Sequence, residues 1–167
     1  MIYKALTLYQ PFASLWALGY KQFETRSWGI GYRGPFAIHA GVRPIEKTLD
    51  SMFLRIEGIT FAEMKFLDAM RDCLGDDFEE DPPYGSIIAT GELIGCHKIV
   101  LNGGRGLSSS SLGRIENEKL FYEPDEQEVL FGDWSIGRYA WSLTNVKVLP
   151  EPIKASGKQG LWDWSAE

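Results

Sequence analysis

The chain has 167 residues, of which 44% are hydrophobic and 24% charged, and its formal net charge at pH 7 is −6. This length suits one domain with a sizeable core, and the composition is that of an ordinary globular protein. The acidic balance argues against a protein that coats nucleic acid non-specifically, and no apolar run has the length that a membrane-spanning helix needs.

The N-terminal part of the chain predicts short strands and one helix in succession. Residues 2–9 read as a strand, and Gln10-Pro11 precedes a helical repeat of apolar side chains. Residues 22–28 alternate again and predict an extended segment. Closely spaced glycines then indicate a turn, and residues 35–40 predict another strand.

Residues 44–80 are expected to add a pair of helices. The first helix follows Pro44, and the second begins with the capping-box spacing Thr60-x-x-Glu63. Its apolar stripe is expected to include Phe61, Met64, Leu67, Met70 and Leu74. We expect this pair to pack on one side of the fold and to contribute stability, not chemistry.

The second half of the chain predicts longer strands. Residues 86–100 are apolar and β-branched enough for a long strand, with Gly91 and Gly95 as bulge positions. Residues 102–130 read as a loop-rich segment. Two later segments predict strands, over 137–149 and 157–164. Short strands with an inserted helical pair favour an α+β chain built around a small β-barrel.

Charge is distributed unevenly along the chain. Residues 1–43 hold five basic residues and one acid, and residues 138–158 hold four and one. The intervening segments 68–81 and 116–133 carry seven acids each, against a single base. If the fold joins the two ends, they form a positive surface that suits a small anion or single-stranded nucleic acid. Duplex DNA is not expected, because the acidic lobes would oppose a large phosphate footprint.

The segment from Lys21 to Trp28 concentrates charge beside an indole. In a strand, Glu24, Arg26 and Trp28 share one face. Lys21 is an odd number of residues from Glu24, so in a regular strand its side chain would lie on the opposite face. It can reach Glu24 only if it belongs to the turn that precedes the strand. The alternative interpretation is an ordinary surface ion pair between Glu24 and Arg26.

Several motifs together resemble one known family. The run LTLYQPFASLWALGYKQFETRSWGIGYRGPFAIHAG resembles the ASCH signature, with its Q-P-F-A-S opening, G-x-K-x-x-E-x-R-S-W centre and later Y-R-G and I-H-A segments. GSIIATGELIGCH, FGDWSIGRYAWSLTNVKVLPEPI and GKQGLWDW resemble its other motifs. The resemblance covers nearly the whole chain, except 44–80 and 102–130, which it marks as insertions. It implies a single ASCH domain over residues 1–167, a PUA-like β-barrel with flanking helices.

The resemblance also implies a function, because ASCH proteins are associated with RNA or nucleoside handling. It implies a protein that binds RNA or a modified nucleoside in a basic cleft lined by the K-x-x-E-x-R segment. Arginine suits a phosphate, a carboxylate accepts hydrogen bonds from a base edge, and an aromatic ring stacks on a base. The expected ligand-binding residues are Gln10, Lys21, Glu24, Arg26, Trp28, Tyr32 and Arg138.

Two other functional classes stay open. A small bacterial ASCH enzyme hydrolyses N4-acetylcytidine with a Lys, a Thr three residues later and a Glu on a following strand. This resemblance implies an amidohydrolase or ribonuclease with Lys21, Glu24 and Glu92 as catalytic residues, where Glu24 occupies the Thr position. The second alternative is a protein-docking adaptor, which would show an apolar patch of several hundred Å².

Three further features favour structural roles over catalysis. His39 lies in an apolar strand and is expected to be a hydrogen-bonded core or rim histidine. Asp133 and Arg138 predict either a packed corner with an ion pair or cleft contacts. Gly157–Gly160 does not fit a P-loop and reads as a turn that presents backbone N–H groups, suited to an anion.

The sequence predicts no cofactor. Its two histidines and two cysteines are scattered and show no metal-ligand spacing. The N-terminus enters a strand pattern directly, with no charged region followed by an apolar signal segment. We therefore expect a cytoplasmic protein with no bound metal and no membrane partner.

Overall fold

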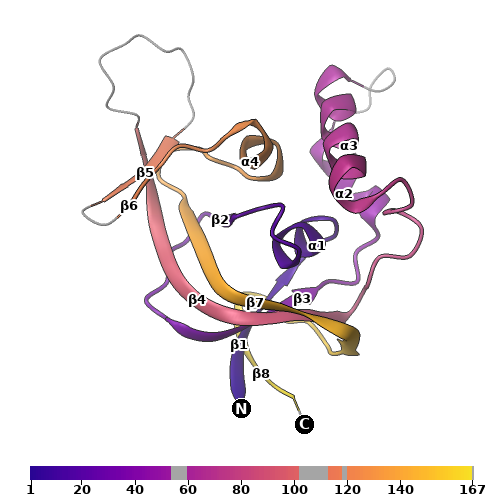
Figure 1. The fold of residues 1–167 in the computed structure, drawn as a ribbon, viewed down its shortest axis with the longest axis vertical. Helices are drawn as coiled ribbons and strands as arrows, with labels where there is room; N and C mark the ends of the chain where they lie inside the picture. The colour runs from indigo at the N-terminus through magenta and orange to yellow at the C-terminus, as the bar shows by residue number, and fades with distance from the viewer. Residues whose placement is uncertain (54–59, 102–112, 118–119, 167) are drawn as a thin grey trace.

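The computed structural model describes residues 1–53, 60–101, 113–117 and 120–166, which form an α+β fold (Figure 1). The strands in these ranges are β1 (Ile2–Leu8), β2 (Phe23–Arg26), β3 (Gly34–Ala40), β4 (Ser86–Leu101), β5 (Gly113–Asn117), β6 (Leu120–Tyr122), β7 (Tyr139–Lys154) and β8 (Leu161–Ser165). The helices are α1 (Phe12–Ala17), α2 (Ile45–Met52), α3 (Phe61–Leu74) and α4 (Glu126–Phe131).

The strands form one strongly curled sheet. Its continuous path is β2-β7-β4-β3-β1-β8, in which only the β1–β3 pair is parallel, and β5 joins β4 to β6. The long strands β4 and β7 bend along their length, so that the sheet is a half-barrel (Figure 1). The β4–β7 register shifts across Gly91, one of the two predicted bulge positions, whereas Gly95 pairs with Ser142 and the adjacent shift falls at Ile94. The predicted α+β class is confirmed, with a half-barrel in place of the expected barrel.

The two ends of the chain lie side by side. Strand β8 pairs antiparallel with β1, from Ile2 opposite Ser165 to Leu6 opposite Leu161, and both termini emerge at the same side (Figure 1). Strand β7, which carries most of the basic segment 138–158, pairs with β2, so the expectation that the two basic segments meet is confirmed for the backbone.

Helix α1 fills the concave side of the sheet. Its buried Trp16 packs against Phe36 of β3 with the rings edge to face, 5.7 Å between centroids. The same apolar cluster contains Leu6, Ile38 and Trp141 from three other positions of the sheet. The turn that follows α1 leads directly into strand β2.

The predicted helical pair is present as α2 and α3. Thr60 accepts a hydrogen bond from the Glu63 N–H (3.2 Å), as the capping box predicts. The prediction of which apolar residues of α3 face the core was partly wrong, because Phe61 and Met64 are exposed and Phe66 is buried in their place. The pair shares a core with α1 and α4, made of Leu15, Ile45, Leu49, Phe66, Leu67, Met70 and Phe131.

The segment 102–130 is described only in part, since residues 102–112 and 118–119 lie outside the described residues. The remainder contains β5, β6 and α4, and is more regular than the expected loop. Asp125 is the N-cap of helix α4, and its side chain accepts a hydrogen bond from the Glu128 N–H (2.8 Å). Across the part of the chain that the structure describes, no helix has the length and apolarity to cross a membrane.

Candidate functional site

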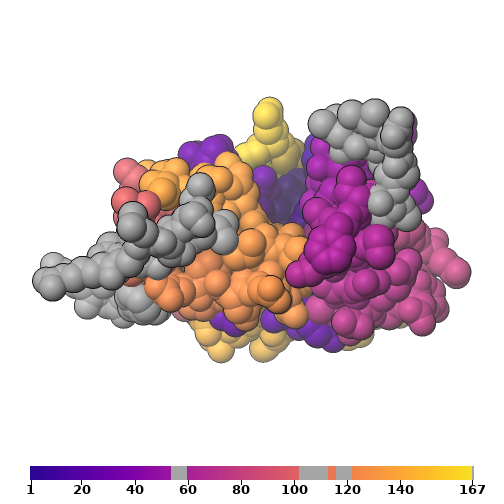
Figure 2. Space-filling view, turned by 90° about the horizontal axis from the view of Figure 1, so that it is seen from above, coloured from indigo at the N-terminus to yellow at the C-terminus, as the bar shows by residue number. Residues whose placement is uncertain are grey.

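A pocket of about 650 Å³ opens where the two ends of the chain meet, and Figure 2 shows the surface hollowed between the purple helices and the yellow C-terminal residues. We call it the composite pocket, because every residue that lines it comes from 6–43 or 157–160. Its lining consists of Leu6, Thr7, Tyr9, Arg26, Trp28, His39, Gly41, Val42, Arg43, Gly157, Lys158, Gln159 and Gly160.

Strand pairing explains why these distant segments converge. The parallel register of β1 and β3 ends with Leu8 beside Ala40, so that the residues after both strands emerge at one edge of the sheet. Strand β8 pairs with the other side of β1, and the loop before it, 157–160, reaches the same edge. The composite pocket is therefore a consequence of the sheet order.

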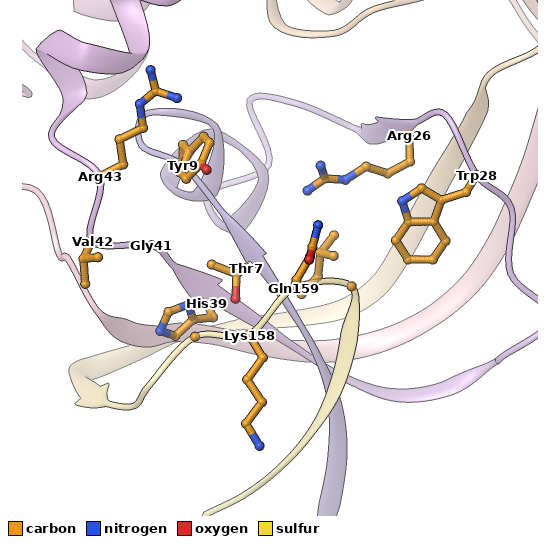
Figure 3. Close-up of a pocket in the computed structure, with 13 residues that line it drawn as sticks. Thr7, Tyr9, Arg26, Trp28, His39, Gly41, Val42, Arg43, Lys158 and Gln159 are labelled. Carbon is orange, nitrogen blue, oxygen red and sulfur yellow. The ribbon is translucent and has the colours of Figure 1, made fainter.

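The charged side chains that line the composite pocket are all basic. No carboxylate side chain is among the described residues that line it. Arg43 donates to the Lys47 carbonyl (2.7 Å) and lies over the Tyr9 ring, 5.1 Å from its centroid. Lys158 lies over Trp162 and extends away from the pocket, whereas the Arg26 guanidinium points into it (Figure 3). Arg26 is therefore the cation best placed to contact a ligand.

Arg26 is the partly exposed end of a row of alternating charges that is otherwise buried. Its Nε lies 3.1 Å from Glu24 Oε1, while Glu24 Oε2 contacts the Lys21 Nζ. The Lys21 and Glu24 side chains are only 3% and 7% exposed. The Arg26 side chain is 28% exposed, so the Glu24–Arg26 pair is partly buried and is not the ordinary surface pair of the alternative interpretation. This contact is an ion pair without hydrogen-bond geometry at Nε, and the terminal NH₂ groups of Arg26 have no partner among the described residues.

Lys21 reaches Glu24 because it lies in a turn and not in strand β2. Gly19, with a φ of +81°, follows the last turn of α1, and the Lys21 N–H donates to the Leu15 carbonyl (3.1 Å). The ammonium also lies 5.6 Å from the centroid of the Phe12 ring. Lys21 therefore belongs to the turn that precedes the strand, which is the arrangement that the sequence required for a contact with Glu24.

A second pocket, of about 330 Å³, lies beside β2. We call it the lysine pocket; it is lined by Phe12, Lys21, Glu24, Thr25, Met52, Leu130, Phe131, Gly132, Asp133 and Arg138. Arg138 Nε lies 3.2 Å from Asp133 Oδ2, and Nη2 donates to the Thr25 carbonyl (3.4 Å). Burial would raise the pKa of Asp133, but hydrogen bonds from Ser135 and the charge of Arg138 lower it below its usual value.

The structure therefore divides the predicted site residues between two neighbouring pockets. Arg26 and Trp28 line the composite pocket, whereas Lys21, Glu24 and Arg138 line the lysine pocket. The Glu24–Arg26 ion pair connects them. Trp28 is 37% exposed, and its ring meets Trp141 edge to face at 4.7 Å between centroids.

Three predicted site residues lie outside both pockets. Gln10 is buried; its Oε1 accepts from the Ser14 N–H (3.2 Å) at the start of α1, and its Nε2 donates to the Pro83 carbonyl (3.3 Å). The Tyr32 hydroxyl donates to the Pro35 carbonyl (2.7 Å). Glu92 is exposed on β4 and lines a different pocket, so the structure does not bring it together with Lys21.

Helix α4 supplies residues that the sequence interpretation missed. Glu128 is buried and accepts a hydrogen bond from the Gln22 N–H, and Gln127 Nε2 donates to the Tyr20 carbonyl (2.7 Å). Burial raises the pKa of Glu128, although bonds from the Gln22 and Phe23 N–H groups and the charge of Lys21 oppose this. These contacts hold the turn that carries Lys21. The Asp125-x-x-Glu128 spacing was the available signal, since it is a helix-start pattern.

His39 anchors the loop before β8. It is buried, as expected, and its Nε2 lies 3.0 Å from the Ala155 carbonyl oxygen. A Cβ on Gly157 would lie 2.5 Å from His39 Cε1 and 2.9 Å from Thr7 Oγ1, so only glycine allows this approach. Trp162 Nε1 donates to the same Thr7 hydroxyl (3.2 Å). The loop is thus held closely against β1 and β3.

Protonation of His39 should weaken the fold. Burial lowers the pKa of His39 below 6.5, and the bond to the Ala155 carbonyl only partly opposes this. As the pH falls through about 6.5, the unfolded chain takes up a proton that the native state resists, so the free energy of unfolding decreases. In urea denaturation, the stability difference between wild type and His39→Gln should therefore be largest near pH 7.5 and shrink toward pH 5. A difference that stays constant with pH would contradict this role.

No protein-family model matches the chain, and no curated protein matches it. The resemblance to the ASCH family therefore remains a prediction from the sequence motifs. Among the described residues, no group of three or more His, Cys, Asp or Glu side chains is arranged to hold a metal ion.

Proposed function

We propose that this chain binds RNA or a modified nucleoside in the composite pocket, as an ASCH-type domain with a PUA-like half-barrel. The observation that carries the proposal is the Arg26 guanidinium, which forms an ion pair with buried Glu24 and points into a pocket that has no carboxylate among its described lining residues. A guanidinium held in this way presents the planar fork that binds a phosphate through two hydrogen bonds.

The other lining residues suit the remaining parts of a nucleotide. Trp28 is 37% exposed and contacts Trp141 edge to face, so part of its indole is accessible for an unpaired base to stack on. Tyr9 adds a second aromatic ring next to Arg43. A volume of about 650 Å³ is in the range of small-molecule sites and holds a nucleotide, not a duplex.

The lysine pocket supports a second candidate, an amidohydrolase of the N4-acetylcytidine type. The observation in its favour is the contact between Lys21 and Glu24 inside a pocket that also contains Arg138. Hydrolysis of an amide needs a proton acceptor and a group that stabilises an oxyanion. The carboxylate expected from β4 does not lie there, because Glu92 lines a different pocket. We therefore rank binding above hydrolysis.

One experiment separates the two candidates. Wild type and Lys21→Ala are incubated with a panel of nucleosides, including N4-acetylcytidine, and short single-stranded RNAs, and are examined by thermal shift and product chromatography. For a binding protein, we expect a shift of the wild-type melting temperature and unchanged ligands in every sample. Turnover of the acetylated nucleoside by the wild type, reduced by about 10²-fold or more in Lys21→Ala, would reverse the ranking.

A further inference from the structure

The loop 157–160 carries a polar side chain that the proposed function leaves unused. The start of the loop packs against strands β1 and β3, because His39 contacts the Ala155 carbonyl and Gly157 packs against His39 and Thr7. Gly160, with a φ of +70°, ends the loop in the left-handed conformation that glycine adopts at little cost. The backbone between these points is therefore well supported.

Gln159 lies in this supported loop and lines the composite pocket. In Figure 3 its amide extends toward the side of the pocket where Arg26 and Trp28 lie, whereas the neighbouring Lys158 points the opposite way. The structure gives the amide no hydrogen bond with the described residues, and the side chain is exposed. An amide in this position offers a carbonyl acceptor and an NH₂ donor side by side.

We propose that Gln159 reads the edge of a nucleobase that stacks on Trp28. This inference rests on the proposed function and specifies its ligand class: an unpaired nucleotide whose base edge is free to exchange two hydrogen bonds. Each base edge carries its own pattern of donors and acceptors, and a supported amide matches some patterns better than others. Arg26 then contributes affinity through the phosphate, and Gln159 contributes discrimination between bases.

The test compares ligands with and without a base. Calorimetric titration measures the affinity of the wild type for the four nucleoside 5′-monophosphates and for ribose 5-phosphate. We expect nucleotides to bind about tenfold more tightly than ribose 5-phosphate, because they add base stacking. We also expect affinities to differ between bases by about fivefold or more.

Two variants test whether Gln159 causes the difference in affinity between bases. Gln159→Leu should keep the affinity for ribose 5-phosphate and reduce the spread between the four bases to less than about twofold. Gln22→Leu makes the same chemical change at an exposed position outside the composite pocket, and should bind as the wild type does.

The outcomes distinguish this inference from the proposed function. If Gln159→Leu keeps the full spread between bases, or if nucleotides bind no more tightly than ribose 5-phosphate, base reading by Gln159 is wrong while phosphate binding in the pocket stands. If the wild type binds none of these ligands, nucleotide binding is wrong and base reading falls with it.

Discussion

Glu24→Ala is expected to lower the free energy of unfolding by about 3–5 kcal/mol, as measured by urea denaturation at pH 7. The substitution leaves the Lys21 ammonium, which is only 3% exposed, without the carboxylate that it contacts. A buried charge that loses its partner pays the desolvation cost without the compensating attraction. The same change releases Arg26 Nε, so ligand binding should weaken as well.

The surface pair Lys4–Asp163 provides the matched control. Its two charges are 2.6 Å apart, but both side chains are well exposed to solvent. Asp163→Ala removes the same kind of carboxylate and should cost roughly 0–1 kcal/mol, because water and salt screen exposed pairs. If Glu24→Ala cost no more than Asp163→Ala, the row of charges from Lys21 to Arg26 would not be a buried network.

Arg26→Leu is expected to weaken binding of nucleoside 5′-monophosphates by about 100-fold, as measured by calorimetric titration. It removes two charge-assisted hydrogen bonds to the phosphate, each contributing roughly 1.5 kcal/mol or more. Arg26→Lys keeps the positive charge but loses the planar fork of the guanidinium, so its affinity should lie between those of the wild type and Arg26→Leu. Nucleosides that lack a phosphate should lose much less affinity.

Arg33→Leu is the control for this loss of charge. Arg33 is exposed, donates to the carbonyls of Ile30 and Tyr32, and lines neither the composite nor the lysine pocket. We expect less than a twofold change in affinity, because a distant exposed charge is largely screened. Equal losses in Arg26→Leu and Arg33→Leu would mean that only net charge matters, and that no phosphate site exists at Arg26.

Local patterns predicted the elements that build the site. The alternation of Glu24 and Arg26 placed both on one face of a strand, and the glycine at position 19 allowed the turn that brings Lys21 to Glu24. Apolar periodicity also predicted both helices between residues 45 and 74. These features depend on residues close together in the chain, where the period of the pattern specifies the geometry.

Features that depend on distant contacts could not be predicted in this way. Gln10 reaches Pro83 and Glu128 reaches Gln22, pairs separated by 73 and 106 residues. The Asp125-x-x-Glu128 spacing predicts where a helix starts, but it does not predict which segment of the chain that helix will contact. The division of Arg26 and Arg138 between two pockets likewise depends on how side chains from distant segments pack around β2.

The most direct test of a nucleotide site in the composite pocket is an NMR titration of ¹⁵N-labelled wild type with each of the four nucleoside 5′-monophosphates. We expect the Trp28 indole N–H and the backbone amides of Gly41, Gly157 and Gly160 to shift together with one dissociation constant, because they surround this pocket. The Gly132 amide in the lysine pocket should move much less. Shifts centred on Gly132, with Trp28 and the loop 157–160 unchanged, would contradict the proposed site.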